Sequence, residues 1–162
     1  MAFRWDEMPR IDGGRVRLRP LVDADVPALF EIFGDPEVMR YWSSPPLTGL
    51  TAARELLDDI HQHFTAKTLF QWGITRTGMR REQWGHGYAS AAVGALIRFA
   101  FETLDLHRLE ADADPQNAAS LGVLVKQGFK REGFLRERYF LNGEPQDAEY
   151  YGLLRREWTP GR

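Results

Sequence analysis

Apolar residues recur with helical spacing between Ser90 and Leu104. Counted from the first of them, they fall at i, i+3, i+4, i+7, i+8 and i+11: Val93, Leu96, Ile97, Ala100, Phe101 and Leu104. A helix of 3.6 residues per turn gathers these positions into one apolar stripe. The segment therefore predicts an amphipathic helix that packs its stripe against a core.

A short strand is expected near the start of the chain. Residues 16–20 alternate Val and Leu with Arg and end at Pro20, a pattern typical of a half-buried strand that the proline terminates. The basic residues Arg15, Arg17 and Arg19 then share one face. We expect that face to be solvated.

Three helices are predicted before the strand at residues 70–75. The first begins after Asp23 as N-cap and ends at Gly34, and the second has Asp35 as N-cap and Pro36 in its first turn. The third is capped by Thr51. The first and third carry apolar residues at intervals of three or four, which predicts one buried side for each.

After these helices, the chain shows mainly strand patterns. Apolar and polar residues alternate over 70–75, and a further strand is expected at 108–111. After a helix over 117–126, two strands at 138–140 and 150–154 flank Asn142-Gly143, a pair typical of a tight hairpin turn. The whole pattern predicts an α+β fold with an antiparallel tail, in a single domain over residues 1–162.

Composition narrows the function classes. A chain of 162 residues with a formal net charge of −2 gives no reason to expect a nucleic-acid partner. The absence of cysteine excludes disulfides, thiolate metal sites and a cysteine nucleophile. No apolar run has membrane-spanning length and the start lacks the apolar core of a signal peptide, so we expect no membrane partner and a cytoplasmic location.

A glycine-rich segment precedes the amphipathic helix. In Trp84-Gly85-His86-Gly87-Tyr88-Ala89, two glycines one residue apart allow consecutive backbone N–H groups to converge on an anion at a helix N-terminus. A pyrophosphate is the expected ligand, and a plain turn into a helix is the alternative. The segment lacks the Lys-Ser/Thr of a Walker loop and the third glycine of a dinucleotide fingerprint.

A second motif lies downstream and changes the interpretation. Asp114-Pro115-Gln116-Asn117-Ala118-Ala119-Ser120, followed by Gly128-Phe129, resembles the Asn-x-x-Ser…Gly-Phe signature of the GNAT superfamily. With the glycine-rich segment, it is similar to the RimJ/RimL branch, which contains the ribosomal-protein N-terminal acetyltransferases. The resemblance extends over essentially the whole chain. It implies a three-layer α+β fold with a mixed, mostly antiparallel central sheet flanked by helices.

The resemblance implies acetyl-CoA as cosubstrate and no metal. The family's phosphate loop falls on this segment, so the amides of Gly85, His86, Gly87, Tyr88 and Ala89 are expected at the pyrophosphate. Asn117 corresponds to the side chain that hydrogen-bonds the pantetheine arm, although it also suits a helix N-cap. Lys126 is expected at the 3′-phosphate, and the backbone of Met79 and Arg80 at the pantetheine. His61 and His63, at i and i+2 of a helix, diverge and do not suggest a metal pair.

Two residues are expected to take part in catalysis. Ser120 corresponds to the hydroxyl proposed to protonate the leaving thiolate, and an ordinary first-turn serine is the alternative. Tyr139 stands where ribosomal-protein acetyltransferases can show a glutamate base, and it can instead donate a proton to the thiolate. The base then stays open among Glu137, Asp147 and Glu149, each of which also fits a solvated strand charge.

One part of the family pattern is missing. The family has two more strands before its phosphate loop, but after Arg76 only residues 77–83 remain here, too few for two strands of about 5–6 residues and a turn. Either this sequence lacks a stretch of the natural chain, or the chain is a shortened relative that does not catalyse. We expect the former, with a chain break between about Arg76 and Arg81.

Two functions follow. The first is an N-acetyltransferase that moves an acetyl group from acetyl-CoA to a primary amine, such as a protein N-terminus, a polyamine, an amino acid or an antibiotic. The second is a non-catalytic acyl-CoA-binding or interaction domain on the same fold. The resemblance is also compatible with a homodimer. Variable loops build acceptor pockets in such folds, so the pattern does not choose the amine.

Overall fold

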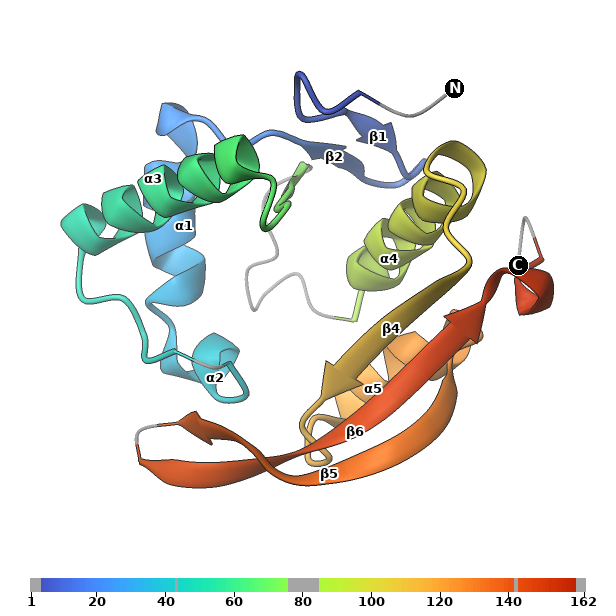
Figure 1. Ribbon diagram of the computed structural model, residues 1–162. Helices are drawn as coiled ribbons and strands as arrows, with labels where there is room; N and C mark the ends of the chain where they lie inside the picture. The colour runs from blue at the N-terminus through green and yellow to red at the C-terminus, as the bar shows by residue number, and fades with distance from the viewer. Residues whose placement is uncertain (1–3, 43, 76–84, 142, 160–162) are drawn as a thin grey trace. The chain divides into compact units, whose positions relative to one another are not determined.

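The structure is a computed structural model that describes residues 4–42, 44–75, 85–141 and 143–159. The chain forms two compact units, residues 4–92 and residues 93–162, and the boundary falls within helix α4 (Tyr88–Arg98; Figure 1). Each unit has its own strands and its own buried cluster. The single domain expected from the sequence stays a prediction, and the units are described separately.

The N-terminal unit holds a small antiparallel sheet in the order β1-β2-β3. Its strands are β1 (Ile11–Asp12), β2 (Arg17–Arg19) and β3 (Gly73–Thr75). Leu18 of β2 pairs with Ile11 on one side and Ile74 on the other, and it is almost fully buried. The strand predicted before Pro20 is confirmed, and β3 is the second half of the strand predicted at 70–75.

Helices complete this unit. They are the 3₁₀ turn η1 (Asp23–Asp25), α1 (Val26–Phe33), α2 (Pro36–Met39) and α3 (Leu50–Ala66). Helices α1 and α3 pack together through a cluster of four buried residues: Val26, Leu29, Ala53 and Leu57. The apolar spacing thus predicted the contact face of both helices.

Two of the three predicted helix caps are wrong. Asp35 does cap α2, because its carboxylate accepts a hydrogen bond from the Glu37 N–H at 2.8 Å. Asp23 instead lies inside η1, and the carboxylate of Asp25 accepts the Val22 N–H. Helix α3 begins at Leu50 after Gly49, so Thr51 lies in its first turn.

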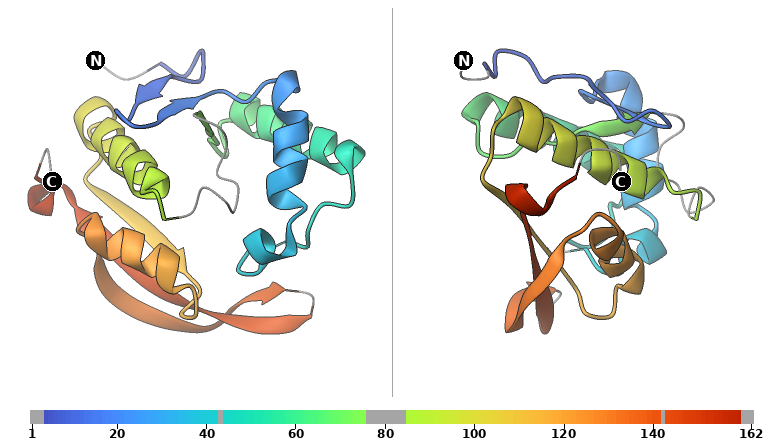
Figure 2. Two further views of the ribbon diagram at one scale, coloured as in Figure 1. Left: turned by 180° about the vertical axis from the view of Figure 1, so that it is seen from behind. Right: turned by 90° about the vertical axis from the view of Figure 1, so that its right-hand side faces the viewer.

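The C-terminal unit contains a second antiparallel sheet, in the order β4-β6-β5. Helix α4 (Tyr88–Arg98) continues as the π-helical turn η3 (Phe99–Thr103) and is followed by β4 (Arg108–Ala113) and α5 (Ala118–Lys126). The chain ends with β5 (Lys130–Leu141), β6 (Glu144–Leu154) and the 3₁₀ turn η4 (Arg155–Glu157). Figure 2 shows α5 lying along one face of this sheet.

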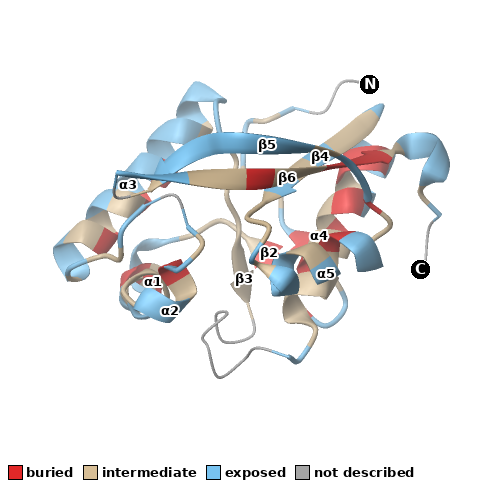
Figure 3. Ribbon diagram, turned by 90° about the horizontal axis from the view of Figure 1, so that it is seen from below, coloured by how far each residue is buried: buried red, intermediate tan, exposed pale blue. Residues whose placement is uncertain are grey.

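One face of this sheet is apolar and packs on helices. Its core joins α4, η3, α5 and β6 through six buried residues: Ile97, Phe101, Leu124, Phe129, Tyr151 and Leu153. Leu109 and Ala111 of β4 pack against the same cluster. Burial is therefore greatest in the last third of β6, whereas β5, at the sheet edge, is exposed along nearly its whole length (Figure 3).

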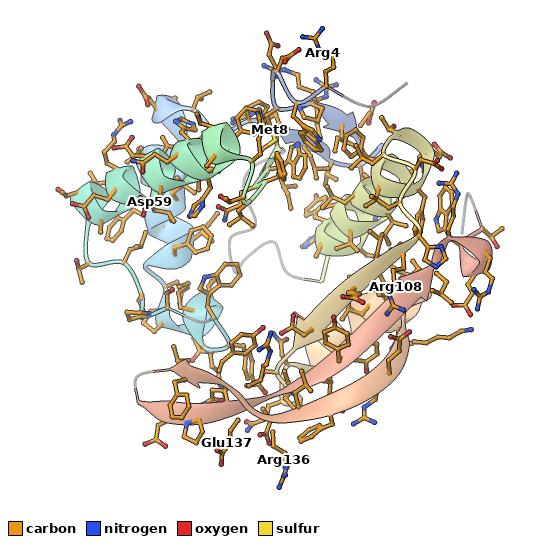
Figure 4. All side chains as sticks on the ribbon, viewed as in Figure 1. Arg4, Met8, Asp59, Arg108, Arg136 and Glu137 are labelled. Atoms are coloured by element: carbon orange, nitrogen blue, oxygen red, sulfur yellow. The ribbon has the colours of Figure 1, made fainter. Side chains whose placement is uncertain are left out.

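The β5–β6 hairpin carries an irregularity. The register shifts between Leu135 and Tyr139, and within the shift Glu137 has a φ of 51°. Its N–H donates to the Asp147 carboxylate at 2.8 Å, which holds the bulge against β6. The side chains of Arg136 and Glu137 point outward from β5 (Figure 4). Gly143, in the predicted hairpin turn, has a φ of 84°, a conformation that favours glycine.

Several expectations fall on residues that the structure does not describe. Residues 76–84 separate β3 from the glycine loop, and the predicted chain break and both predicted pantetheine contacts, Met79 and Arg80, lie within them. In the described part of the chain, no helix has the length and apolar character to cross a membrane.

Candidate active site

The glycine loop, Gly85–Ala89, leads into helix α4 and contains two left-handed glycines. Gly85 and Gly87 both adopt positive φ, at 80° and 76°, a region that side chains with a Cβ rarely enter. The loop is partly open to solvent, with Gly85 and His86 exposed. The two glycines therefore turn the backbone sharply just before α4.

Helix α4 starts at the end of this loop. The Ala91 N–H donates to the Gly87 carbonyl at 3.0 Å, which is the first hydrogen bond of the helix. The N–H groups of Tyr88 and Ala89 precede that bond, so helical geometry gives them no partner within α4. Together with the positive end of the helix dipole, they can receive an anion.

Three side chains cluster around this loop. The rings of His86 and Tyr88 stack, with centroids 5.8 Å apart. The guanidinium carbon of Arg15 lies 5.7 Å from the centroid of the Tyr88 ring. Of the three arginines expected to form a solvated face, Arg15 and Arg17 are exposed, whereas Arg19 is half-buried and pairs with Asp25.

In the C-terminal unit, Asn117 caps helix α5. Its side-chain oxygen accepts a hydrogen bond from the Ser120 N–H at 3.1 Å. This confirms the N-cap interpretation and leaves the amide NH₂ group of Asn117 for another acceptor. Ser120 is exposed in the first turn and Lys126 is exposed in the last turn.

The face of the sheet opposite the core is polar. Because side chains alternate along β4, Arg108, Glu110 and Asp112 lie on this face. Arg108 forms ion pairs with Glu110 at 2.9 Å and with Glu132 of β5 at 2.6 Å. Tyr150 of β6 donates its hydroxyl hydrogen to Glu110. The Glu132 side chain lies over Gly152 of β6. A methyl group on Gly152 would clash with the Glu132 carboxylate, so this contact requires glycine.

Tyr139 joins this polar face. Its hydroxyl donates to a carboxylate oxygen of Asp112 at 2.6 Å. That hydrogen bond, reinforced by partial burial and by the Asp112 charge, raises the pKa of Tyr139 above its ordinary value. The phenol is therefore firmly protonated near neutral pH, and its proton is directed at a carboxylate.

Two of the three carboxylates considered as bases make other contacts, and the third is exposed, as Asp112 is. Asp147 holds the bulge at Glu137, whose own side chain is exposed. Glu149 accepts the Tyr151 hydroxyl hydrogen at 2.9 Å and pairs with Arg131 at 3.1 Å. Sequence reasoning missed Asp112. The alternation Arg-Leu-Glu-Ala-Asp-Ala over 108–113 was the available signal, because it places Asp112 on a polar face just before the Asn117 motif.

The histidine pair of α3 is not arranged for a metal. The Nε2 of His61 lies 3.0 Å from the Leu21 carbonyl oxygen, whereas the Nδ1 of His63 lies 2.9 Å from the Thr68 hydroxyl. Within the described ranges, no group of three or more His, Asp or Glu side chains could hold a metal ion.

Comparison with known proteins identifies the family. A model of the acetyltransferase (GNAT) domain matches residues 15–81 and 77–130, well over half of the chain. The chain belongs to the GNAT family of acetyltransferases. Its fold agrees with the crystal structure of the acetyltransferase (GNAT family) from Bacillus anthracis, with a TM-score of 0.76 over 92% of this chain and 100% of that chain, at 22% identity.

Two curated relatives refine this assignment. The uncharacterised N-acetyltransferase YoaA of Bacillus subtilis strain 168 is 26% identical over 172 residues, which cover 91% of this chain and 97% of that protein. The [ribosomal protein uS5]-alanine N-acetyltransferase of Escherichia coli K12 is 33% identical over 82 residues, or 50% of this chain and 42% of that protein. The predicted resemblance to the RimJ/RimL branch is confirmed, as is the α+β fold with mostly antiparallel strands.

Family membership fixes the reaction class. The chain is a GNAT N-acetyltransferase, and the family takes the acetyl group from acetyl-CoA and passes it to an amine acceptor.

Proposed function

We propose that the loop Gly85–Ala89 binds the pyrophosphate of acetyl-CoA and that the C-terminal unit supplies the groups that move protons during transfer to a primary amine. The observation that carries the first part is the pair of left-handed glycines, Gly85 and Gly87, directly before the first hydrogen bond of α4. Asn117 is proposed to bind the pantetheine arm through its side-chain NH₂ group, and Lys126 the 3′-phosphate.

We assign the role of proton acceptor to Asp112. The amine reaches the enzyme as an ammonium ion and must lose a proton before its nitrogen attacks the thioester carbonyl. Asp112 is a carboxylate on an accessible sheet face, with the Tyr139 hydroxyl fixing one of its oxygens. It takes the ammonium proton through water, the C–N bond forms, the C–S bond breaks, and the nitrogen releases its second proton to water.

Tyr139 and Ser120 divide the remaining predicted roles. A phenol beside a carboxylate is a poor acid, because loss of its proton would place two negative charges together, and the pKa of Tyr139 is accordingly raised. We therefore propose that Tyr139 positions Asp112 and that Ser120 protonates the leaving thiolate, regaining its proton from water. Ser120→Ala then lowers kcat with little change in CoA affinity. Full turnover in that variant would return the role to Tyr139 or to water.

The proposed activity has a direct test. Released CoA carries a free thiol, and this chain has no cysteine, so a thiol reagent reports turnover without background from the protein. The assay is run with acetyl-CoA and a panel of amines: a peptide with N-terminal alanine, a polyamine, a free amino acid and an aminoglycoside. Amine-dependent thiol release supports the enzyme. CoA binding without release for any amine would support the non-catalytic alternative.

The acceptor we favour is a protein N-terminus. The similarity to the uS5-alanine enzyme supports this choice. An α-amino group has a pKa of about 7.7–8.0 and needs less help from a base than a lysine side chain at about 10.4. A distant carboxylate acting through water suits that lower demand. In the panel, the alanine peptide is expected to give the highest kcat/KM.

A further proposal concerns residues missing between β3 and α4. The family model matches residues 15–81 and residues 77–130, two stretches that overlap at residues 77–81. The alignment with YoaA has 172 positions but covers 91% of 162 residues, about 147, so about 25 aligned positions have no counterpart here. That length suits two strands and a turn. We propose that the natural protein contains them, and its intact mass should then lie well above 18.6 kDa. A mass of 18.6 kDa would instead make this chain a shortened relative.

A further inference from the structure

We propose that Arg15 is a coenzyme-binding residue whose guanidinium pairs with the pyrophosphate held by the Gly85–Ala89 loop. The inference rests on the proposed role of that loop and adds a residue from a distant part of the sequence. All of these residues belong to the N-terminal unit.

The backbone of Arg15 is fixed by the turn between β1 and β2. The Gly14 N–H donates to the Asp12 carboxylate at 2.8 Å, and the Gly13 N–H donates to the Val16 carbonyl at 2.8 Å. Val16, the next residue, is buried, as is Leu18 two residues further along. The Arg15 side chain therefore extends from a tight hairpin whose backbone is held by hydrogen bonds.

The guanidinium lies against the loop itself. A methyl group placed on Gly87 would be 3.5 Å from Nη1 of Arg15, which is ordinary van der Waals contact. The same guanidinium lies over the ring of Tyr88, 5.7 Å from its centroid. Arg15 thus reaches the point where the backbone turns into α4.

The placement of this charge is unfavourable without a ligand. The N-terminus of a helix carries partial positive charge, so a nearby cation typically costs about 0.3–1 kcal/mol, whereas an anion is stabilised. Among the described residues, Arg15 has no carboxylate partner, in contrast to Arg19, Arg108 and Arg131. An anion bound at the loop would be attracted by both the helix terminus and the guanidinium.

Pyrophosphate fits this arrangement. It is a dianion with several acceptor oxygens, and a guanidinium can donate two parallel hydrogen bonds to phosphate oxygens. The loop amides and Arg15 would then share one ligand. A purely structural role, in which Arg15 only stacks on Tyr88, is the competing explanation.

The test compares binding of CoA and dephospho-CoA by calorimetry in the wild-type chain and three variants. Arg17→Gln is the matched control, since Arg17 follows Arg15 by two residues, begins β2 and is exposed, as Arg15 is. Arg15→Gln is expected to weaken both ligands by about tenfold, because both carry the pyrophosphate. Arg15→Lys keeps the charge and should retain part of the affinity, whereas Arg17→Gln should match the wild type. In turnover, Arg15→Gln should raise the KM for acetyl-CoA and leave kcat unchanged.

Several results would overturn the proposal. Equal CoA affinity in Arg15→Gln and wild type would make the residue structural and leave the loop's role intact. A loss seen with CoA but absent with dephospho-CoA would move Arg15 to the 3′-phosphate. An equal loss in Arg17→Gln would indicate general charge attraction. If Arg15→Gln does not fold, the comparison rests on Arg15→Lys, in which unchanged CoA affinity would also count against the proposal. A wild-type chain that does not bind CoA would remove the proposed function of the loop as well.

Discussion

The hydroxyl of Tyr139 on β5 donates a 2.6 Å hydrogen bond to the carboxylate of Asp112 on β4, across the intervening strand β6. The register shift between Leu135 and Tyr139 lies directly before this contact. The shift places the Tyr139 ring of the edge strand β5 on the same polar face as Asp112. The bond ties the residue predicted to be catalytic to a carboxylate that sequence reasoning had not selected.

The roles proposed for Asp112 and Tyr139 predict losses of activity that differ in size and share one dependence on pH. If Asp112 accepts the ammonium proton, Asp112→Asn should lower kcat/KM by about tenfold to a hundredfold near pH 7. The loss should shrink above about pH 8, where an α-amino acceptor is largely neutral and needs no base. Tyr139→Phe should cause a smaller loss with the same pH trend, because it only loosens Asp112. A constant loss across the pH range in Asp112→Asn would contradict the assignment.

The ion pair of Arg19 and Asp25 should contribute to the stability of the N-terminal unit. Two hydrogen bonds of 2.7 Å join the guanidinium and the carboxylate, and the hydrogen bond from Arg19 is the main cause that lowers the pKa of Asp25. Asp25→Asn is expected to reduce the free energy of unfolding by about 1–2 kcal/mol at pH 7.

The lowered pKa of Asp25 sets how its contribution to stability depends on pH. A carboxylate with a lowered folded pKa contributes stability above its unfolded pKa of about 3.9, and the contribution is lost as pH falls through the folded value. Wild type and Asp25→Asn should therefore differ in urea unfolding at pH 7 and converge in strong acid. Asp6→Asn is the control, because the Arg4–Asp6 pair is largely exposed, with side-chain exposures of 84% and 69%. A difference for Asp25→Asn that does not shrink in acid would exclude the ion pair as its source.

Two glycines of the C-terminal unit should respond differently to alanine. Gly122 lies inside α5 and is exposed, and a methyl group added to its Cα would have no other atom within 4 Å. Gly122→Ala should therefore stabilise the unit by about 0.5–1 kcal/mol through the better helix propensity of alanine.

Gly94 in α4 provides the contrast. A methyl group there would lie 3.1 Å from the side-chain oxygen of Gln127, so the gain in helix propensity is offset by a tight contact. Scanning calorimetry should show a rise of about 1–4 °C in Tm for Gly122→Ala and a smaller rise or a fall for Gly94→Ala. An equal rise in both variants would mean that the contact with Gln127 has no cost.

Local patterns predicted the elements but not all of their ends. The apolar stripe of α4, the N-cap Asn117 and the hairpin around Gly143 follow from spacing and turn chemistry within a few residues. Asp23 and Asp25 are equally good caps by sequence. Asp25 occupies the N-cap position of α1 without a side-chain cap hydrogen bond, and its carboxylate pairs with Arg19, six residues before it, a contact that no cap rule takes into account.

The candidate site was harder to predict for the same reason. The glycine loop is a local feature, because positive φ at Gly85 and Gly87 is a property of the residues themselves. The contacts of Arg15 with Tyr88 and of Tyr139 with Asp112 join residues far apart in the chain. They depend on strand register and hairpin placement, which a single sequence does not specify.

The central claim, that the Gly85–Ala89 loop holds the coenzyme, is tested most directly by titrating CoA into Gly87→Val in a calorimeter. Gly87 has a φ of 76°, so valine there should distort the loop and fill the space of the phosphates, and affinity should fall at least about tenfold. Gly143→Val, at a φ of 84° in the β5–β6 turn, imposes similar backbone strain elsewhere and should bind CoA like the wild type. Unchanged affinity in Gly87→Val would contradict the claim and remove the loop from the coenzyme site.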